Sequence, residues 1–268
     1  MDDYRISEDR VAHYDCRRAR EAFPINGDLE KPVWKRAEKS RPFVDLVTGG
    51  PAPLNTRMAA LWDEKALYAA YWIDEPDVRA SFTQRDSLIW FDNDVELFFD
   101  GEDCYYEFEI NAFNTVYEVL FIYQDALKRG SRFEPLFDLY NRDVDVLGGF
   151  QDAARFRRRP RGRRWAFMDF DFPSLQSGVR VDGKINDPSR VDRGWTVELA
   201  FPWEGFRILS PGKSFPPKEE DSIRCQFFRF ENLRANGREL GSAGWALNEH
   251  GVYDSHIPEN FAWLHFRD

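Results

Sequence analysis

Two runs of alternating side chains, residues 94–100 and 105–111, constrain the fold of this chain more than any other part of its sequence. They flank the turn-forming residues 101–103, a pattern typical of a β-hairpin. Because strand side chains alternate between two faces, we expect one apolar face and one polar face. The apolar face carries Val95, Leu97, Phe99, Tyr106, Phe108 and Ile110, and the polar face carries Asp94, Glu96, Asp100, Glu107, Glu109 and Asn111.

Strand patterns recur along the rest of the chain, and helices are few. The sequence predicts a short helix over 29–39, with Asp28 as its N-cap and Trp34 pointing to the core, and another short helix after Pro202. Further strands are expected at 57–62, 66–73, 115–123, 177–181, 195–201, 223–230 and 261–266. About ten strands without an internal repeat favour an all-β fold, a two-sheet antiparallel β-sandwich.

The chain is expected to form a single domain over 25–268, preceded by an extended N-terminal arm over 1–24 that is polar and rich in Arg and Asp. The strand pattern weakens over about 124–176, which predicts a long inserted loop region. This region contains the segment 155–164, in which seven of ten residues are arginine. We interpret it as a solvated, salt-bridged loop, with an interaction patch for an acidic partner as the alternative.

Charge and cysteine content narrow the class of partner. A net charge of −10 argues against binding to nucleic acid or to an anionic membrane, because both depend on Lys and Arg. The widely spaced Cys16, Cys104 and Cys225 suggest reduced thiols, not disulfides or a zinc site.

The N-terminus lacks the apolar segment of a signal peptide, and no apolar run approaches the ~18–20 residues of a membrane span. The sequence as given therefore predicts a cytoplasmic protein.

No familiar catalytic motif is present, and the four histidines are not at metal-ligand spacing. A glycosidase, however, needs only two carboxyl groups at a suitable separation. Two of Glu96, Glu107 and Glu109 would meet that need, which leaves a carbohydrate-active hydrolase in carbohydrate catabolism as an alternative. A haem-binding scaffold is a third possibility, and it would require axial His or Met ligands.

Several motifs resemble the family 9 carbohydrate-binding modules, particularly their stand-alone, family 9-like branch. The resemblance covers roughly residues 24–268 and is carried by INGDLEKPVW, LWDEKALYAAYWID, IWFDNDVELFFD, YYEFEINAFNT, GWTVELAFPW and PENFAWLHF. It implies an immunoglobulin-like sandwich that binds a mono- or oligosaccharide without catalysis and requires no cofactor. The family is best known as ancillary domains of xylanases, which hold the ends of sugar chains such as xylan.

The resemblance assigns roles to residues of the hairpin. Trp90 and Glu96 match the family's stacking indole and its hydrogen-bonding glutamate, and Asn111 matches a retained asparagine. An indole packs against the C–H face of a pyranose, and a carboxylate accepts hydrogen bonds from vicinal hydroxyls. These residues are therefore our first candidates for a sugar-binding site.

Other positions depart from the family pattern. Glu109 stands where the family has an arginine. Arg229 is a candidate to restore a cationic donor, with a plain surface ion pair as the alternative. The family's second stacking tryptophan is missing, and Trp245, Tyr253 or His256 would replace it. Structural calcium is common in the family, and acidic residues of this chain suggest candidate ligands. These are Asp92, Asp94, Asp100 and Asp103.

Overall fold

The chain folds into fourteen strands and few helices, seen in a computed structural model that describes residues 4–147, 161–235 and 238–268. The strands are β1 (His13–Arg18), β2 (Val44–Asp45), β3 (Thr56–Trp62), β4 (Ala66–Asp74), β5 (Asp94–Asp100), β6 (Cys104–Asn111), β7 (Val116–Tyr123), β8 (Val144–Leu147), β9 (Arg164–Phe167), β10 (Gln176–Asp182), β11 (Gly194–Pro202), β12 (Ser222–Ala235), β13 (Arg238–Ala246) and β14 (Ala262–Arg267). The helices are α1 (Pro32–Arg36) and α3 (Trp203–Leu209), with 3-10 turns η1 (Glu8–Arg10), η2 (Ile89–Phe91) and η3 (Pro258–Asn260).

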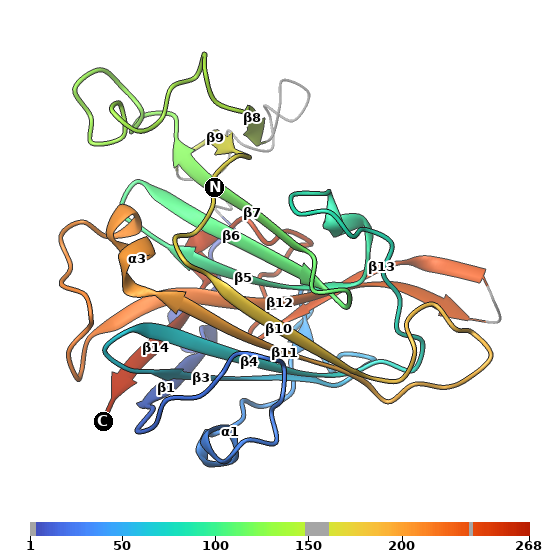
Figure 1. Ribbon diagram of the computed structural model, residues 1–268. Helices are drawn as coiled ribbons and strands as arrows, with labels where there is room; N and C mark the ends of the chain where they lie inside the picture. Colours follow the sequence, from blue (N-terminus) through green and yellow to red (C-terminus); the bar gives the residue numbers. More distant parts are fainter. Residues whose placement is uncertain (1–3, 148–160, 236–237) are drawn as a thin grey trace.

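The strands form two layers that pack face to face (Figure 1). One layer contains β10, β11, β4 and β3, and the other contains β12, β5, β6 and β7. Their inner faces meet in a large apolar core, where the Tyr71 hydroxyl on β4 donates a 2.6 Å hydrogen bond to the backbone carbonyl of Glu96 on β5. The prediction of an all-β sandwich is confirmed. The two layers are continuous through β1, β14 and β12, so the strands belong to one folded-over, mixed sheet.

The predicted hairpin is present as β5 and β6. Its antiparallel register places Asp94 opposite Asn111 and Glu96 opposite Glu109. Asp103 in the turn has a φ of 69°, in the left-handed region that Asp tolerates better than most residues. The hairpin therefore sets four polar side chains on one face, as the alternation predicts.

The segment expected to be an N-terminal arm instead supplies a strand inside the sheet. β1 pairs in parallel with β14 on one side and with β3 on the other. Within its sequence HYDCRR, Tyr14 and Cys16 point inward and are buried, while their neighbours face solvent. The segment is so short and polar that local alternation does not predict a strand there. The parallel pairs of β1 correct the expectation of a purely antiparallel sheet.

The first helix is shorter than the predicted 29–39, because Pro32 fits only in a first helical turn. Asp28 therefore lies before the helix and is not its N-cap. Trp34 is buried as expected, and its indole N–H donates a 2.7 Å hydrogen bond to Glu198 on β11. This contact attaches the helix to the layer that contains β11, on the face that points away from the other layer.

The region expected as a long insertion, about 124–176, contains two short strands at the edge of the second layer. β9 pairs antiparallel with β7 and with β8. Most of the arginine-rich segment 155–164 lies outside the described residues. Within its described end, Arg161 forms ion pairs with Asp103 at 2.7 Å and Asp125 at 2.8 Å, as a salt-bridged loop would.

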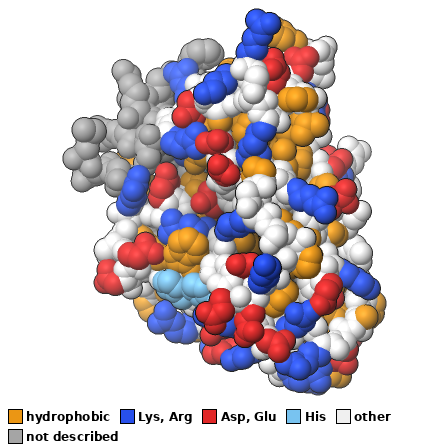
Figure 2. All heavy atoms as spheres, turned by 90° about the vertical axis from the view of Figure 1, so that its left-hand side faces the viewer, with side chains coloured by type: hydrophobic (Ala, Val, Ile, Leu, Met, Phe, Trp, Pro, Cys, Tyr) orange, Lys and Arg blue, Asp and Glu red, His pale blue; other side chains and the backbone are white. Residues whose placement is uncertain are grey.

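Charges of both signs are mixed on the face of the molecule shown in Figure 2, without a large patch of one sign. In the described parts of the chain, no helix has the length and apolar character needed to cross a membrane.

A buried network around Arg229 on β12 connects the two layers. The guanidinium donates to the Thr56 hydroxyl on β3 at 2.9 Å and to the Asp74 carbonyl on β4 at 3.0 Å. It also pairs with Glu231 at 2.8 Å and with Glu75 at 3.6 Å. Because these groups are almost fully buried, the cation is needed to compensate the two carboxylates.

Replacing this cation should strongly destabilise the fold. We expect Arg229→Met, which keeps the side-chain volume, to cost ~3–5 kcal/mol, because the carboxylates of Glu75 and Glu231 remain buried without their partner. Arg234→Gln on the same strand removes a half-exposed pair with Glu239 at 3.9 Å and should cost less than ~1 kcal/mol. Urea unfolding of both variants measures the difference, and similar midpoints would contradict a structural role for the Arg229 network.

Asp100, at the end of β5, should make stability depend on pH. Burial raises its pKa to about 7, although Arg224 and the Gly101 N–H, at 3.0 Å, oppose the shift. A carboxyl with a raised folded-state pKa stabilises the protein at low pH, and this stability is lost as pH rises through about 7. Asp100→Asn should therefore stabilise the protein by up to ~4 kcal/mol at pH 8 and have little effect at pH 4. Melting curves at both pH values test this, and an equal effect at both would contradict it.

Candidate functional site

A cavity of about 860 Å³ opens above the polar face of the β5–β6 hairpin. Glu96, Glu107 and Glu109 form its floor. Its sides come from η2, from β7 to β9, and from the region between β12 and residue 256. The volume lies in the range of pockets that hold small molecules. Segments distant in sequence thus meet over the hairpin.

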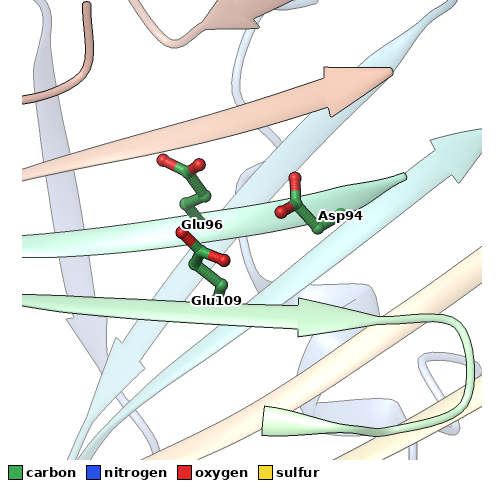
Figure 3. Close-up of side chains that lie close together, drawn as sticks. All are labelled: Asp94, Glu96 and Glu109. Atoms are coloured by element: carbon green, nitrogen blue, oxygen red, sulfur yellow. The ribbon is translucent and has the colours of Figure 1, made fainter. Parts of the chain in front are cut away.

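The acidic floor is buried and not, as alternation alone suggests, a solvated outer face. Glu96 and Glu107 are 4% exposed, Glu109 is 1% exposed, and Asp94 is fully buried behind them. Single carboxylate oxygens of Asp94, Glu96 and Glu109 all lie within 4.8 Å of one another. Figure 3 shows these side chains rising from the two adjacent strands on the same side of the sheet. Like charges so close in a sheet are destabilising, which marks the floor as a site adapted to something other than stability.

Burial and mutual repulsion shift the pKa values of these carboxyl groups upward. For Glu96, burial is the main cause, followed by the charges of Asp94 and Glu107. The pKa of Glu109 is raised for the same reasons, and that of Glu107 is raised by burial to about 8 although a hydrogen bond with Glu109 opposes the shift. His256 Nε2 lies 3.7 Å from Glu107 and links the floor to the cavity wall. Each of these carboxyl groups therefore holds a proton more readily than a carboxyl group in water does.

Aromatic side chains stand on opposite sides of the cavity. Trp90, in η2, is 40% exposed, and its indole is held edge-on against the ring of Tyr117 at a centroid distance of 5.0 Å. Tyr253 is 46% exposed, and its hydroxyl lies 2.9 Å from the Ser242 hydroxyl. Each ring is positioned by a neighbour and keeps part of its surface accessible. The cavity therefore combines two apolar walls with an acidic floor.

The structure brings together four of the residues predicted for ligand binding. Trp90, Glu96, Glu109 and His256 all line the cavity. Tyr253, one of three candidates for the missing second stacking residue, lies there as well.

Three predicted ligand-binding residues lie elsewhere. Arg229 is enclosed in its buried network, and Trp245 is fully buried beside it, with its ring centroid 5.1 Å from the guanidinium carbon. The Asn111 amide N–H donates to the Phe82 carbonyl at 2.9 Å and to Asp92 at 3.1 Å. None of the three lines the cavity, so their polar groups serve the fold.

The four predicted metal ligands do not converge. Asp94 and Asp100 lie at opposite ends of β5, and Asp103 follows in the hairpin turn. Asp92 accepts hydrogen bonds from the backbone of Ser81 and Phe82 at 2.7 and 3.0 Å, which fixes a loop at the cavity rim. The acidic side chains that do converge are Asp94, Glu96 and Glu109.

Several cavity residues were not singled out from the sequence. Tyr117 lies opposite Glu109 in the β6–β7 register, so a correct register for β7 would have placed it on this face. Arg79 and Arg234 also line the cavity and bring cationic donors, the role expected of Arg229. No local pattern identifies them, because they come from a loop and from the far end of β12.

Comparison with known proteins supports the fold. A candidate carbohydrate-binding protein from Bacteroides uniformis has a similar structure, with a TM-score of 0.63 and 14% identity over 96% of this chain and 100% of that chain. A family 9 carbohydrate-binding module from Caldicellulosiruptor kristjanssonii is similar in its complexes with cellotriose and with glucose. The TM-score is 0.53 for both, at 11% and 12% identity, over 95% of this chain and 94% and 96% of those chains.

Sequence comparison points the same way for one part of the chain. No curated protein matches the sequence significantly. The profile of carbohydrate-binding family 9 matches residues 53–132, a segment that includes β3 to β7 with Trp90, Glu96 and Glu109. The resemblance to carbohydrate-binding family 9 is therefore confirmed, over the segment that builds the floor and one wall of the cavity.

Proposed function

We propose that this protein binds a mono- or oligosaccharide in the cavity above β5 and β6, without catalysing its conversion. The observation that carries the proposal is the position of Trp90, which is partly exposed at the cavity wall beside a floor of buried carboxyl groups. An indole buried between the sheets would have served only the core.

Trp90 offers a flat apolar surface suited to a pyranose ring. The C–H groups of a sugar ring pack against an aromatic face, and the indole buries a large area at small entropic cost. The edge contact with Tyr117 fixes the indole before a ligand arrives, which reduces the ordering that binding requires. Tyr253 lines the cavity and provides a second aromatic surface, and we assign to it the role of the missing second stacking residue.

The floor supplies hydrogen-bond acceptors that are not used within the protein. Across the described residues, Glu96 Oε2 and Glu109 Oε2 are buried and have no hydrogen-bond donor. Sugar hydroxyls are donors as well as acceptors, so neighbouring hydroxyls would satisfy these oxygens. Arg79 and Arg234 at the cavity wall bring complementary donors for other hydroxyls.

The comparisons support the same class of ligand. The matched family is a carbohydrate-binding one, and its profile covers Trp90 and the acidic hairpin. The neighbouring structures from C. kristjanssonii hold glucose and cellotriose, which makes both sugars suitable first ligands to test here.

The geometry favours binding over the glycosidase alternative. A glycosidase needs its two carboxyl groups on opposite sides of the bond that it breaks. Glu96, Glu107 and Glu109 instead rise from two adjacent strands of one floor. They approach a bound sugar from the same side, which suits hydrogen bonding to hydroxyls.

Sugar titrations test the proposal. We expect glucose, cellobiose, cellotriose, xylose or xylobiose to produce saturable heat in isothermal titration, together with a change in tryptophan fluorescence. Trp90→Ala should abolish the fluorescence response and weaken binding at least tenfold, about 1.4 kcal/mol, because the stacking surface is lost. Glu96→Gln should weaken binding by a similar factor, because an amide accepts fewer hydrogen bonds than a carboxylate.

The matched control is Tyr140→Ala, which removes an aromatic ring that is 95% exposed and lies outside the cavity. This variant should bind like the unmodified protein. The proposal would be abandoned if none of the sugars bound, or if Trp90→Ala bound them unchanged. Turnover of a chromogenic glycoside that disappeared in Glu96→Gln would establish the hydrolase alternative instead.

A further inference from the structure

Asp94, which lies beside the acidic floor, is the most unusual of these carboxyl side chains. It is fully buried, and neither of its carboxylate oxygens has a hydrogen-bond donor in the part of the chain that the structure describes. Burial raises the pKa of Asp94 well above its usual value, and the charges of Asp92 and Glu107 raise it further, whereas the backbone of Phe230 opposes the shift. An ionised carboxylate in this position would be strongly destabilising without a partner.

Protonation alone does not satisfy this cluster. A protonated Asp94 would need an acceptor for its O–H, and no described group is within hydrogen-bonding geometry of either oxygen. In the described part of the chain, Glu96 Oε2 and Glu109 Oε2 are likewise buried without partners, and carboxylate oxygens of both residues lie within 4.8 Å of one from Asp94. Three carboxyl groups with unused oxygens therefore face one small space.

We propose that Asp94, Glu96 and Glu109 bind one divalent cation at the floor of the cavity. Oxygens of the three side chains lie within 4.8 Å of one another, which allows all of them to contact one central ion (Figure 3). The ion replaces the missing hydrogen-bond donors and compensates the repulsion between the carboxylates.

The ligand set selects a hard cation. All three ligands are carboxylates, without a thiolate or an imidazole among them, which suits calcium, magnesium or manganese. Calcium takes ligands at about 2.3–2.6 Å, so ligands on opposite sides of it are roughly 5 Å apart, whereas magnesium requires closer ligands. Oxygens up to 4.8 Å apart are compatible with calcium, which we take as the ion to test.

The site is accessible from the cavity. Glu96 and Glu109 line the cavity, and Asp94, two residues from Glu96 on the same face of β5, is fully buried beside them. Since calcium accepts about six to eight ligands, positions on the cavity side remain for water or for hydroxyl groups of a ligand. The inference does not depend on the proposed sugar binding, because the ion is held by the protein's own carboxylates.

The test uses calcium chloride alone, added to the full chain after treatment with EDTA. We expect saturable binding of one ion in isothermal titration, a calcium-dependent rise in melting temperature, and terbium luminescence sensitised by nearby tryptophans such as Trp90. Asp94→Asn and Glu109→Gln should each weaken calcium binding at least tenfold. Asp103→Asn, in the hairpin turn, is the matched control and should leave binding unchanged.

Melting without metal separates loss of the site from loss of the fold. Asp94→Asn should melt at the same temperature as the EDTA-treated protein or above it, because a buried repulsion is removed, and should no longer respond to calcium. The proposal is overturned if calcium up to about 5 mM, beyond the weakest protein calcium sites, gives neither heat nor a shift in melting temperature. It is also overturned if Asp94→Asn binds calcium normally. A third contrary result would be that glucosamine, whose ammonium group can pair with carboxylates, stabilises the protein and calcium does not.

Discussion

The buried guanidinium of Arg229 is the interaction on which the rest of the architecture depends. It joins β12 in one layer to β3 and β4 in the other, and it compensates Glu75 and Glu231. The Asn93 side chain donates to both of these carboxylates at 2.8 Å. Because Asn93 lies between η2 and β5, the network that holds the layers together also positions the indole of Trp90 and the first acidic residue of the floor.

The β5–β6 hairpin is buried on both faces, for different reasons. Its apolar face belongs to the core and stabilises the fold in the usual way. Its polar face lies under the cavity and gathers carboxyl groups that repel one another and lack internal partners. A sheet selected for stability alone would not pair Glu96 with Glu109. The locally unfavourable pair is best understood as part of a binding site.

Local periodicity was sufficient to predict most strands, the hairpin and the side of it that carries the acidic residues. It could not predict that this side is buried, because Tyr253 and His256 in the cavity wall are more than 140 residues from Glu109 in sequence. The same limit explains the errors over Arg229 and Trp245. In the register Arg229 lies opposite Val95, on the core face of β5, and Trp245 lies opposite Arg229. Both side chains therefore point into the interior, where they contact Thr56. The strand β1 was missed because its sequence is short and charged.

The position of β1 has a consequence for how the chain reaches its native state. The rings of His13 and His265 stack at the pairing of β1 with β14, and they are separated by 252 residues in sequence. Among the described strands, this pair is where the two layers are continuous. During synthesis, β1 has no neighbour on that side until nearly all of the strands have left the ribosome. Closure of the sheet therefore waits for β14, and until then β1 exposes an unpaired edge of the kind on which chains aggregate.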